Sequence, residues 1–148
     1  MILKDRKHII VIGAPKAGTT WLQHVLDAEP SFWCPPHQEV HFFDKRSSDE
    51  ISSYEAIYLN APRDAITVDV TPAYIRDKHA LSLISKNIDH MAKDVKLIAL
   101  LREPVSRAFS HYQMFLNYGR NYKDFLAALS QKDEIYWSSM YGMLLTRL

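Results

Sequence analysis

Residues 13–20 of the sequence, GAPKAGTT, combine the residue types that bind an anion. They follow the apolar run HIIVIG and precede a stretch with helical spacing. A glycine loop between a buried strand and a helix points several backbone N–H groups at one place, where the helix dipole adds positive charge. Thr19 and Thr20 add hydroxyl donors, and Lys16 adds a full charge. The pattern therefore predicts a phosphate-binding loop rather than a plain turn with a solvated lysine.

The position of the lysine indicates which phosphate the loop takes. A nucleoside-triphosphate loop reads G-x-x-x-x-G-K-[ST], and its lysine reaches the β- and γ-phosphates while the next hydroxyl binds Mg²⁺. Here Thr19 directly follows the second glycine, Gly18, and Lys16 lies inside the loop. This disfavours a triphosphate with Mg²⁺ and favours a single 5′-phosphate that carries a short transferable group.

A second candidate segment is LLREPVSRAFSHY, residues 100–112. Arg102 ends an apolar run, where its guanidinium can form two hydrogen bonds to a phosphate. Ser110 follows two turns along the next helix and could donate its hydroxyl to the same phosphate. Taken alone, these two residues would equally suit an ion pair and an exposed helix position.

A third segment, EVHFFD, carries three polar residues whose types suit proton transfer: Glu39, His41 and Asp44. A positioned carboxylate can take the proton of an attacking hydroxyl. By spacing alone, however, the segment indicates a polar strand edge whose two phenylalanines enter the core.

The first two segments together resemble the cofactor-binding motifs of the sulfotransferases. PKAGTTWL resembles their 5′-phosphosulfate-binding loop, and residues 100–112 resemble their 3′-phosphate-binding segment. That family transfers a sulfuryl group from 3′-phosphoadenosine 5′-phosphosulfate (PAPS) to an acceptor and releases adenosine 3′,5′-bisphosphate. The resemblance requires no metal, and we expect none. It implies that nine residues bind the cofactor: Pro15, Lys16, Ala17, Gly18, Thr19, Thr20, Trp21, Arg102 and Ser110.

The third segment resembles the E-x-H-F-F-D stretch of the heparan-sulfate-type, carbohydrate-directed sulfotransferases. VTPAYI, residues 70–75, resembles their T-P-A-Y segment. The resemblance implies that Glu39 is the general base, that His41 is a further catalytic residue, and that Asp44 and Asp69 lie on the acceptor side of the same site. Lys16 would also be catalytic, because it can neutralise charge that grows on the bridging oxygen.

One departure bears on the acceptor. The heparan-type enzymes commonly have a lysine before the threonine of T-P-A-Y, and Val70 stands there in this chain. The loss of that positive contact leaves glycan specificity open, so we expect a small-molecule, carbohydrate or lipid acceptor with a free hydroxyl. His111, beside Ser110, is the alternative base.

Two other functions remain open on the residues. A P-loop kinase of nucleotides or small molecules would bind ATP with Mg²⁺ and would need a lysine where Thr19 stands. A non-catalytic module would bind adenosine bisphosphate without turnover.

The elements that must position these residues follow from hydrophobic spacing. Apolar runs alternate with helical patterns, which predicts an α/β fold of the P-loop type, with three α/β/α layers and a mostly parallel central sheet. In the helix after Pro104 we expect an apolar stripe of Val105, Ala108, Phe109, Tyr112 and Leu116. We expect strands at 8–13, 65–74 and 95–101, a strand or turn at 39–44, irregular or helical structure at 45–63, and helices from 19, over 78–91, from 104, over 122–129 and over 136–148.

We expect residues 1–148 to form a single sulfotransferase-like P-loop domain. The chain ends within the apolar segment MLLTRL, and it lacks the glycine-rich basic loop of the family's later sequence. We therefore expect it to be the N-terminal part of a longer domain.

Composition limits the partners. The formal net charge of +1 gives no global field for nucleic acid, so any anion site must be local. Cys34 is the only cysteine, which excludes an internal disulfide and a cysteine-based zinc site. No apolar run near the start is long enough for a signal or a membrane span, so we expect a cytoplasmic protein. The sequence does not indicate an oligomeric state.

Overall fold

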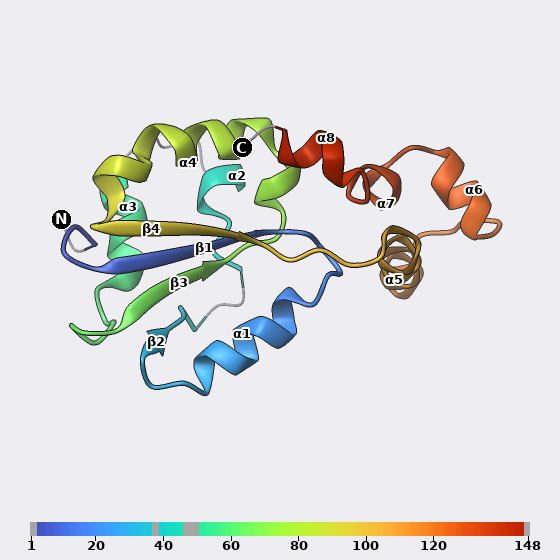
Figure 1. Cartoon of the computed structure of the whole chain (residues 1–148). Coiled ribbons are helices and arrows are strands. Elements are labelled where there is room, and N and C mark those ends of the chain that lie inside the picture. The colour runs from blue at the N-terminus through green and yellow to red at the C-terminus, as the bar shows by residue number, and fades with distance from the viewer. Residues whose placement is uncertain (1–2, 37–38, 46–50, 147–148) are drawn as a thin grey trace.

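A parallel β-sheet forms the centre of the molecule. The structure, a computed structural model, describes residues 3–36, 39–45 and 51–146. In these residues, four strands pair in parallel in the order β2-β3-β1-β4 (Figure 1). Their bounds are β1 Lys7–Gly13, β2 Phe32–Trp33, β3 Ile66–Val70 and β4 Asp94–Ala99.

Helices cover both faces of this sheet and extend beyond one end of it. Figure 1 shows α1 on one face, α2, α3 and α4 on the other, and α5 to α7 past the carboxyl ends of the strands. The expected three-layer α/β fold with a parallel sheet is confirmed. The helices are α1 Thr19–Asp27, α2 Phe42–Lys45, α3 Ile51–Glu55, α4 Lys78–Met91, α5 Pro104–Asn117, α6 Phe125–Ser130, α7 Glu134–Trp137 and α8 Tyr141–Leu145, with 3₁₀ turns at Ala56–Tyr58 and Tyr74–Arg76.

The continuous apolar run in β1 is explained by burial on both of its faces. Ile10 and Ile12 pack into the core under α4, whereas Val11 packs into the core that also contains Leu22 and Leu26. All three β1 residues are fully buried. Strand β1 lies between β3 and β4, so its carboxyl end is the topological switch point of the sheet. Ligands of open α/β sheets bind at such points.

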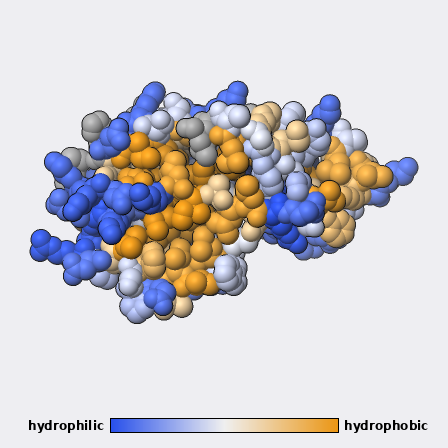
Figure 2. Space-filling view, viewed as in Figure 1, coloured by the Kyte–Doolittle hydropathy of each residue, from blue (hydrophilic) through white to orange (hydrophobic). Residues whose placement is uncertain are grey.

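Strand β4 is an edge of the described sheet and is less buried than β1. Leu97 is 37% exposed, and its neighbour Lys96 is exposed as well. Figure 2 shows apolar side chains gathered on the face of the molecule where Figure 1 places β4.

Several boundaries differ from the sequence-based expectation. Residues 39–41 are irregular and lead into α2, so the strand alternative for 39–44 was wrong. The expected strand 65–74 ends at Val70, and the rest is a turn followed by a 3₁₀ turn, because Pro72 has no N–H to continue the ladder. Strand β2 was not expected, and within 136–148 the described part is not one helix, since α7 ends at Trp137 and α8 begins at Tyr141. Residues 46–50 of the 45–63 segment lie outside the described residues.

Candidate active site

The glycine loop joins β1 to α1 and leaves the start of α1 open. Gly18 is the N-cap of α1, with φ of 102°, and no side chain caps this helix. The first N–H groups of a helix have no intrahelical partner, so these donors are available to an anion. Gly13 is required for a different reason: a Cβ there would lie 2.6 Å from Cγ2 of Ile75. The backbone of Lys16 is also left-handed, with φ of 67°.

The segment after β4 meets this loop. Nη1 of Arg102 lies 3.5 Å from the carbonyl oxygen of Lys16, across 86 positions of sequence. The next residue, Glu103, caps α5 by accepting hydrogen bonds from the N–H groups of Val105 (2.9 Å) and Ser106 (2.6 Å). A hydrogen bond from the side chain of Ser106, followed by these two backbone hydrogen bonds, lowers the pKa of Glu103. The start of α5 is thus occupied by a carboxylate, whereas the start of α1 is open.

The two segments form one wall of a cavity of about 530 Å³. Seven of the nine expected cofactor residues line it: Pro15, Lys16, Gly18, Thr19, Thr20, Arg102 and Ser110. Ala17 and Trp21 do not, and the Trp21 side chain is 66% exposed. Glu39 and His41 line the same cavity, so the residues expected to bind the cofactor and the expected base meet in one space.

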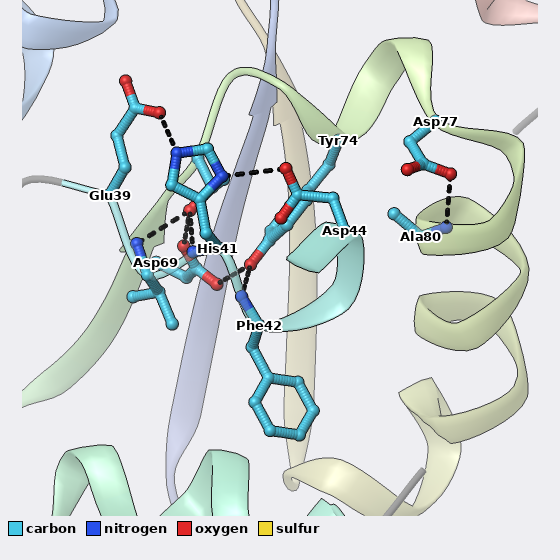
Figure 3. Close-up of polar contacts among 10 residues, drawn as sticks. Glu39, His41, Phe42, Asp44, Asp69, Tyr74, Asp77 and Ala80 are labelled. Atoms are coloured by element: carbon cyan, nitrogen blue, oxygen red, sulfur yellow. Dashed lines mark hydrogen bonds and ion pairs between the residues drawn. The ribbon is translucent and has the colours of Figure 1, made fainter. Parts of the chain in front are cut away.

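His41 lies between two carboxylates (Figure 3). Its Nε2 is 2.8 Å from Oε2 of Glu39, and its Nδ1 is 2.8 Å from Oδ2 of Asp44. A neutral imidazole has a single N–H, so both contacts are hydrogen bonds only if His41 carries two protons or one carboxyl is protonated. The other carboxylate oxygen of Glu39 points away from His41. Asp44 does not line the cavity, but its carboxylate contacts Nδ1 of His41, the ring nitrogen that does not face Glu39.

Asp69 lies beneath the site rather than on its wall. Its side chain is fully buried at the end of β3 and accepts hydrogen bonds from the hydroxyls of Thr71 (2.6 Å), Tyr54 (3.0 Å) and Tyr74 (3.1 Å). Burial raises the pKa of Asp69 to about 6, although these hydrogen bonds act in the opposite direction. The resemblance placed Asp69 on the acceptor side, whereas in the structure its buried side chain does not line the cavity.

A buried arginine holds the cavity wall from the side of α5. Arg107 is fully buried and donates to the carbonyl oxygens of Pro15 (3.2 Å) and Ile135, and to Oγ of Ser139 (2.8 Å). Burial lowers its pKa to about 10, so it keeps its charge at neutral pH. Arg107 thereby ties the glycine loop to α5 and α7.

The same arginine fixes the protonation of His111. Nη1 of Arg107 lies 3.0 Å from Nδ1 of His111, and because a guanidinium only donates, Nδ1 must accept. Burial, with the nearby charge of Arg107, lowers the pKa of His111 to about 3. The neutral ring therefore carries its proton on Nε2. A ring in this state donates a hydrogen bond and does not act as the base, which argues against the alternative base.

Sequence reasoning missed several residues of the cavity wall, among them Arg76 and Glu134, which form an ion pair of 2.5 Å. Nε2 of His111 is 3.9 Å from the same carboxylate oxygen. It also missed Arg107. A signal existed in α5, where Arg107, His111 and Phe115 recur at intervals of four and share one helical face.

The expected apolar stripe of α5 was partly wrong, because Arg107 and His111 occupy part of the buried face. Ala108 is buried as expected, but Val105 is 62% and Phe109 46% exposed. The buried face instead carries Arg107, Ala108, His111 and Phe115.

The described residues contain neither a metal-binding cluster nor a membrane-spanning helix. They contain no group of three or more His, Cys, Asp or Glu side chains arranged to hold a metal ion. In residues 3–36, 39–45 and 51–146, no helix has the length and apolar character needed to cross a membrane.

A glycine loop that opens a helix, with an arginine from the segment after the neighbouring strand beside it, is the arrangement found in α/β phosphate-binding proteins. Residues 6–146 match the model of the sulfotransferase domain, and the chain belongs to this family.

Known relatives agree with this assignment, and a solved structure shares the fold. Mouse heparan sulfate glucosamine 3-O-sulfotransferase 3B1 is 33% identical over 114 residues, which cover 77% of this chain and 28% of that protein. The membrane-associated sulfotransferase kil1 of Dictyostelium discoideum is 28% identical over 114 residues, which cover 75% of this chain and 23% of that protein. The crystal structure of a sulfotransferase from Alicyclobacillus acidocaldarius shares the fold, with a TM-score of 0.77 and 22% identity, over 96% of this chain and 67% of that chain. The chain spans less than a third of the length of the first two relatives.

Proposed function

We propose that this protein transfers the sulfuryl group of PAPS to an acceptor hydroxyl, with Glu39 as the base. The observation that carries the proposal is the shared cavity, in which the open start of α1, Lys16, Arg102 and Glu39 face one space. Membership of the sulfotransferase family supports PAPS as the donor and disfavours the kinase alternative.

The cofactor would lie along the wall formed by the loop and α5. The N–H groups of the first turn of α1 and the hydroxyls of Thr19 and Thr20 would bind its 5′-phosphosulfate. Arg102 and Ser110 would bind its 3′-phosphate, since both line the cavity beside the loop. Nε2 of His111 would offer one further donor.

The reaction would proceed on the side of Glu39. The acceptor oxygen forms the new bond to sulfur while the bond from sulfur to the 5′-phosphate oxygen breaks. Glu39 takes the hydroxyl proton, and adenosine 3′,5′-bisphosphate leaves with its charge stabilised by Lys16. His41, held by Asp44, would keep the Glu39 carboxylate in place through its 2.8 Å contact.

The relatives and the cavity wall support a polar acceptor. The mouse relative is named for heparan sulfate glucosamine, which supports a carbohydrate hydroxyl as acceptor here. The ion pair of Arg76 and Glu134 adds one charge of each sign to the wall, which suits a polar acceptor. A small alcohol and a lipid remain the other candidates, and a cytoplasmic location is part of the proposal.

Ligand binding tests the donor. Adenosine 3′,5′-bisphosphate at 100 times its Kd should stabilise the fold by about 2.7 kcal/mol, which raises Tm by roughly 5–10 °C for a chain of this size. ATP with Mg²⁺ should raise Tm by less. Stabilisation by ATP with Mg²⁺ alone would overturn the proposal. In Arg102→Ala, the preference for the bisphosphate over adenosine 5′-monophosphate should disappear, because the 3′-phosphate loses its partner.

Transfer tests the base. Labelled PAPS is incubated with heparan sulfate, glucosamine or 1-octanol, and label on the acceptor is counted. Glu39→Gln should lower kcat by about a hundredfold or more while bisphosphate binding is kept. The exposed Glu29→Gln is the matched control and should behave as wild type. Retained transfer in Glu39→Gln would remove Glu39 as the base, and binding without transfer in the wild type would favour the non-catalytic module.

A further inference from the structure

The carboxylate of Asp69 is buried and accepts three hydroxyl hydrogen bonds, yet it does not line the cavity. Two of these hydroxyls, those of Thr71 and Tyr74, reach the segment that carries Glu39 and His41. Both hydroxyls accept hydrogen bonds from backbone N–H groups of this segment.

Thr71 holds the first part of the segment. Its Oγ1 accepts from the backbone N–H groups of Val40 (3.1 Å) and His41 (3.4 Å). A hydroxyl oxygen has two lone pairs and one hydrogen. With both lone pairs in use, the hydrogen of Thr71 is donated to Oδ1 of Asp69, at 2.6 Å.

Tyr74 holds the next residue in the same way. Its hydroxyl oxygen accepts from the backbone N–H of Phe42 at 3.0 Å and donates its single hydrogen to Oδ2 of Asp69 at 3.1 Å (Figure 3). Three consecutive N–H groups, at residues 40–42, therefore end on hydroxyls that Asp69 orients.

The segment needs such support. His41 has φ of 51°, in the left-handed region that non-glycine residues rarely adopt. In this conformation Glu39 and Asp44 converge on the two nitrogens of His41. If the N–H groups of residues 40–42 lost their partners, the backbone would relax and the carboxylate of Glu39 would move.

We propose that Asp69 is the positioning residue of the site: acting through Thr71 and Tyr74, it fixes the backbone of residues 40–42 and so sets where Glu39 and His41 lie. The inference rests on the proposed function for the role of Glu39. An asparagine could not replace Asp69, because its single acceptor oxygen cannot serve hydroxyls at both positions.

The experiment compares Asp69→Asn, Thr71→Val and Thr71→Ser in the full chain. Thr71→Val removes the hydroxyl with little change in shape, and Thr71→Ser keeps it. Tyr58→Phe is the matched control: Tyr58 donates to Tyr54 in the same buried network and has no hydrogen bond to residues 40–42.

Amide hydrogen exchange tests the placement without any need for turnover. In Asp69→Asn and Thr71→Val, exchange at residues 40–42 should accelerate by about tenfold or more, while the amides of β1 keep their protection. Thr71→Ser and Tyr58→Phe should match the wild type. Unchanged exchange at residues 40–42 would overturn the proposal.

Kinetics tests the consequence, with labelled PAPS and whichever of heparan sulfate, glucosamine or 1-octanol gives the highest rate. Asp69→Asn and Thr71→Val should lower kcat by about ten- to a hundredfold, as a base displaced by about 1 Å would. The Kd for adenosine 3′,5′-bisphosphate should stay within about twofold, because the cofactor wall is untouched. Affinity that falls as far as kcat would mean a merely structural role and would overturn the proposal. A wild type without transfer would refute the proposed function alone, and exchange would still decide the placement.

Discussion

Acidification from pH 7 to pH 5 should destabilise this fold, and three buried groups, His8, Asp69 and His111, set the amount. Burial lowers the pKa of His8 and of His111 from 6.5 to about 3, and the charge of Arg107 also acts on His111. Burial raises the pKa of Asp69 from 3.8 to about 6. The two histidines and the carboxyl therefore act in opposite directions.

The sign follows from proton uptake. A histidine with a lowered pKa stabilises the fold above pH 6.5, and this stability is lost as pH falls toward 3, because the unfolded chain takes up the proton first. Asp69 has a raised pKa, so its contribution is present at low pH and is lost as pH rises through about 6.

The histidines outweigh the carboxyl. Between pH 7 and 5, each histidine removes about 2 kcal/mol and Asp69 returns about 1 kcal/mol, which leaves a net loss of about 3 kcal/mol. For a chain of this length, the loss lowers Tm by about 8 °C. The free energy of unfolding is measured by urea denaturation at both pH values and constant ionic strength.

Variants isolate the contributions. In His111→Gln, the loss between pH 7 and 5 should shrink to about 1 kcal/mol, and in Asp69→Asn it should grow to about 4 kcal/mol, each relative to the same variant at pH 7. The exposed His79→Gln is the control and should follow the wild type. If His111→Gln loses as much stability as the wild type, His111 is not held neutral by burial, and the assignment of its proton to Nε2 fails.

Three further perturbations test the loop and the helices around the site. Gly13→Ala should lower the free energy of unfolding by about 1–3 kcal/mol, because the new Cβ meets Ile75 at 2.6 Å; Ile75→Ala in the same chain should restore part of the loss in urea denaturation. Asp77→Ala should remove the N-cap of α4 at a loss of about 1 kcal/mol, whereas Asp77→Asn should lose little, which thermal melts will compare. Arg107→Met should raise the Kd for adenosine 3′,5′-bisphosphate by about tenfold in calorimetric titration, since the carbonyl of Pro15 loses its buried donor; an unchanged Kd would show that the loop is held without it.

The sheet and the loop could be predicted because their signals are local. An apolar run buried on both faces needs no alternation, so HIIVIG indicated β1 directly. The glycines at 13 and 18 marked the loop because each is needed for its backbone. Gly13 allows the close approach of Ile75, and Gly18 adopts a positive φ. By contrast, β2 has only two residues, too few for any periodicity.

The roles of buried polar residues could not be predicted, because their partners are distant in sequence. Arg107 and His111 occupy the buried face of α5, where a hydrophobic stripe was expected. Arg107 is accepted there because Pro15, 92 positions away, and Ile135 supply carbonyl oxygens. Asp69 stands beside a predicted site in the sequence, yet only the fold shows that it faces hydroxyls and not the cavity.

Two helices, α1 and α5, begin beside the cavity, and their N-termini are capped differently. The start of α5 carries Glu103, whose carboxylate accepts from two first-turn N–H groups and leaves little room for a second anion. The start of α1 carries Gly18, which supplies no acceptor of its own. We therefore expect a bound phosphate at the start of α1, where Lys16 adds charge, and a second phosphate at Arg102, beside the capped helix. Two such anion sites of unequal kind within one cavity would match a nucleotide with phosphates at both its 5′ and 3′ positions better than a linear triphosphate, whose charges lie along a single chain.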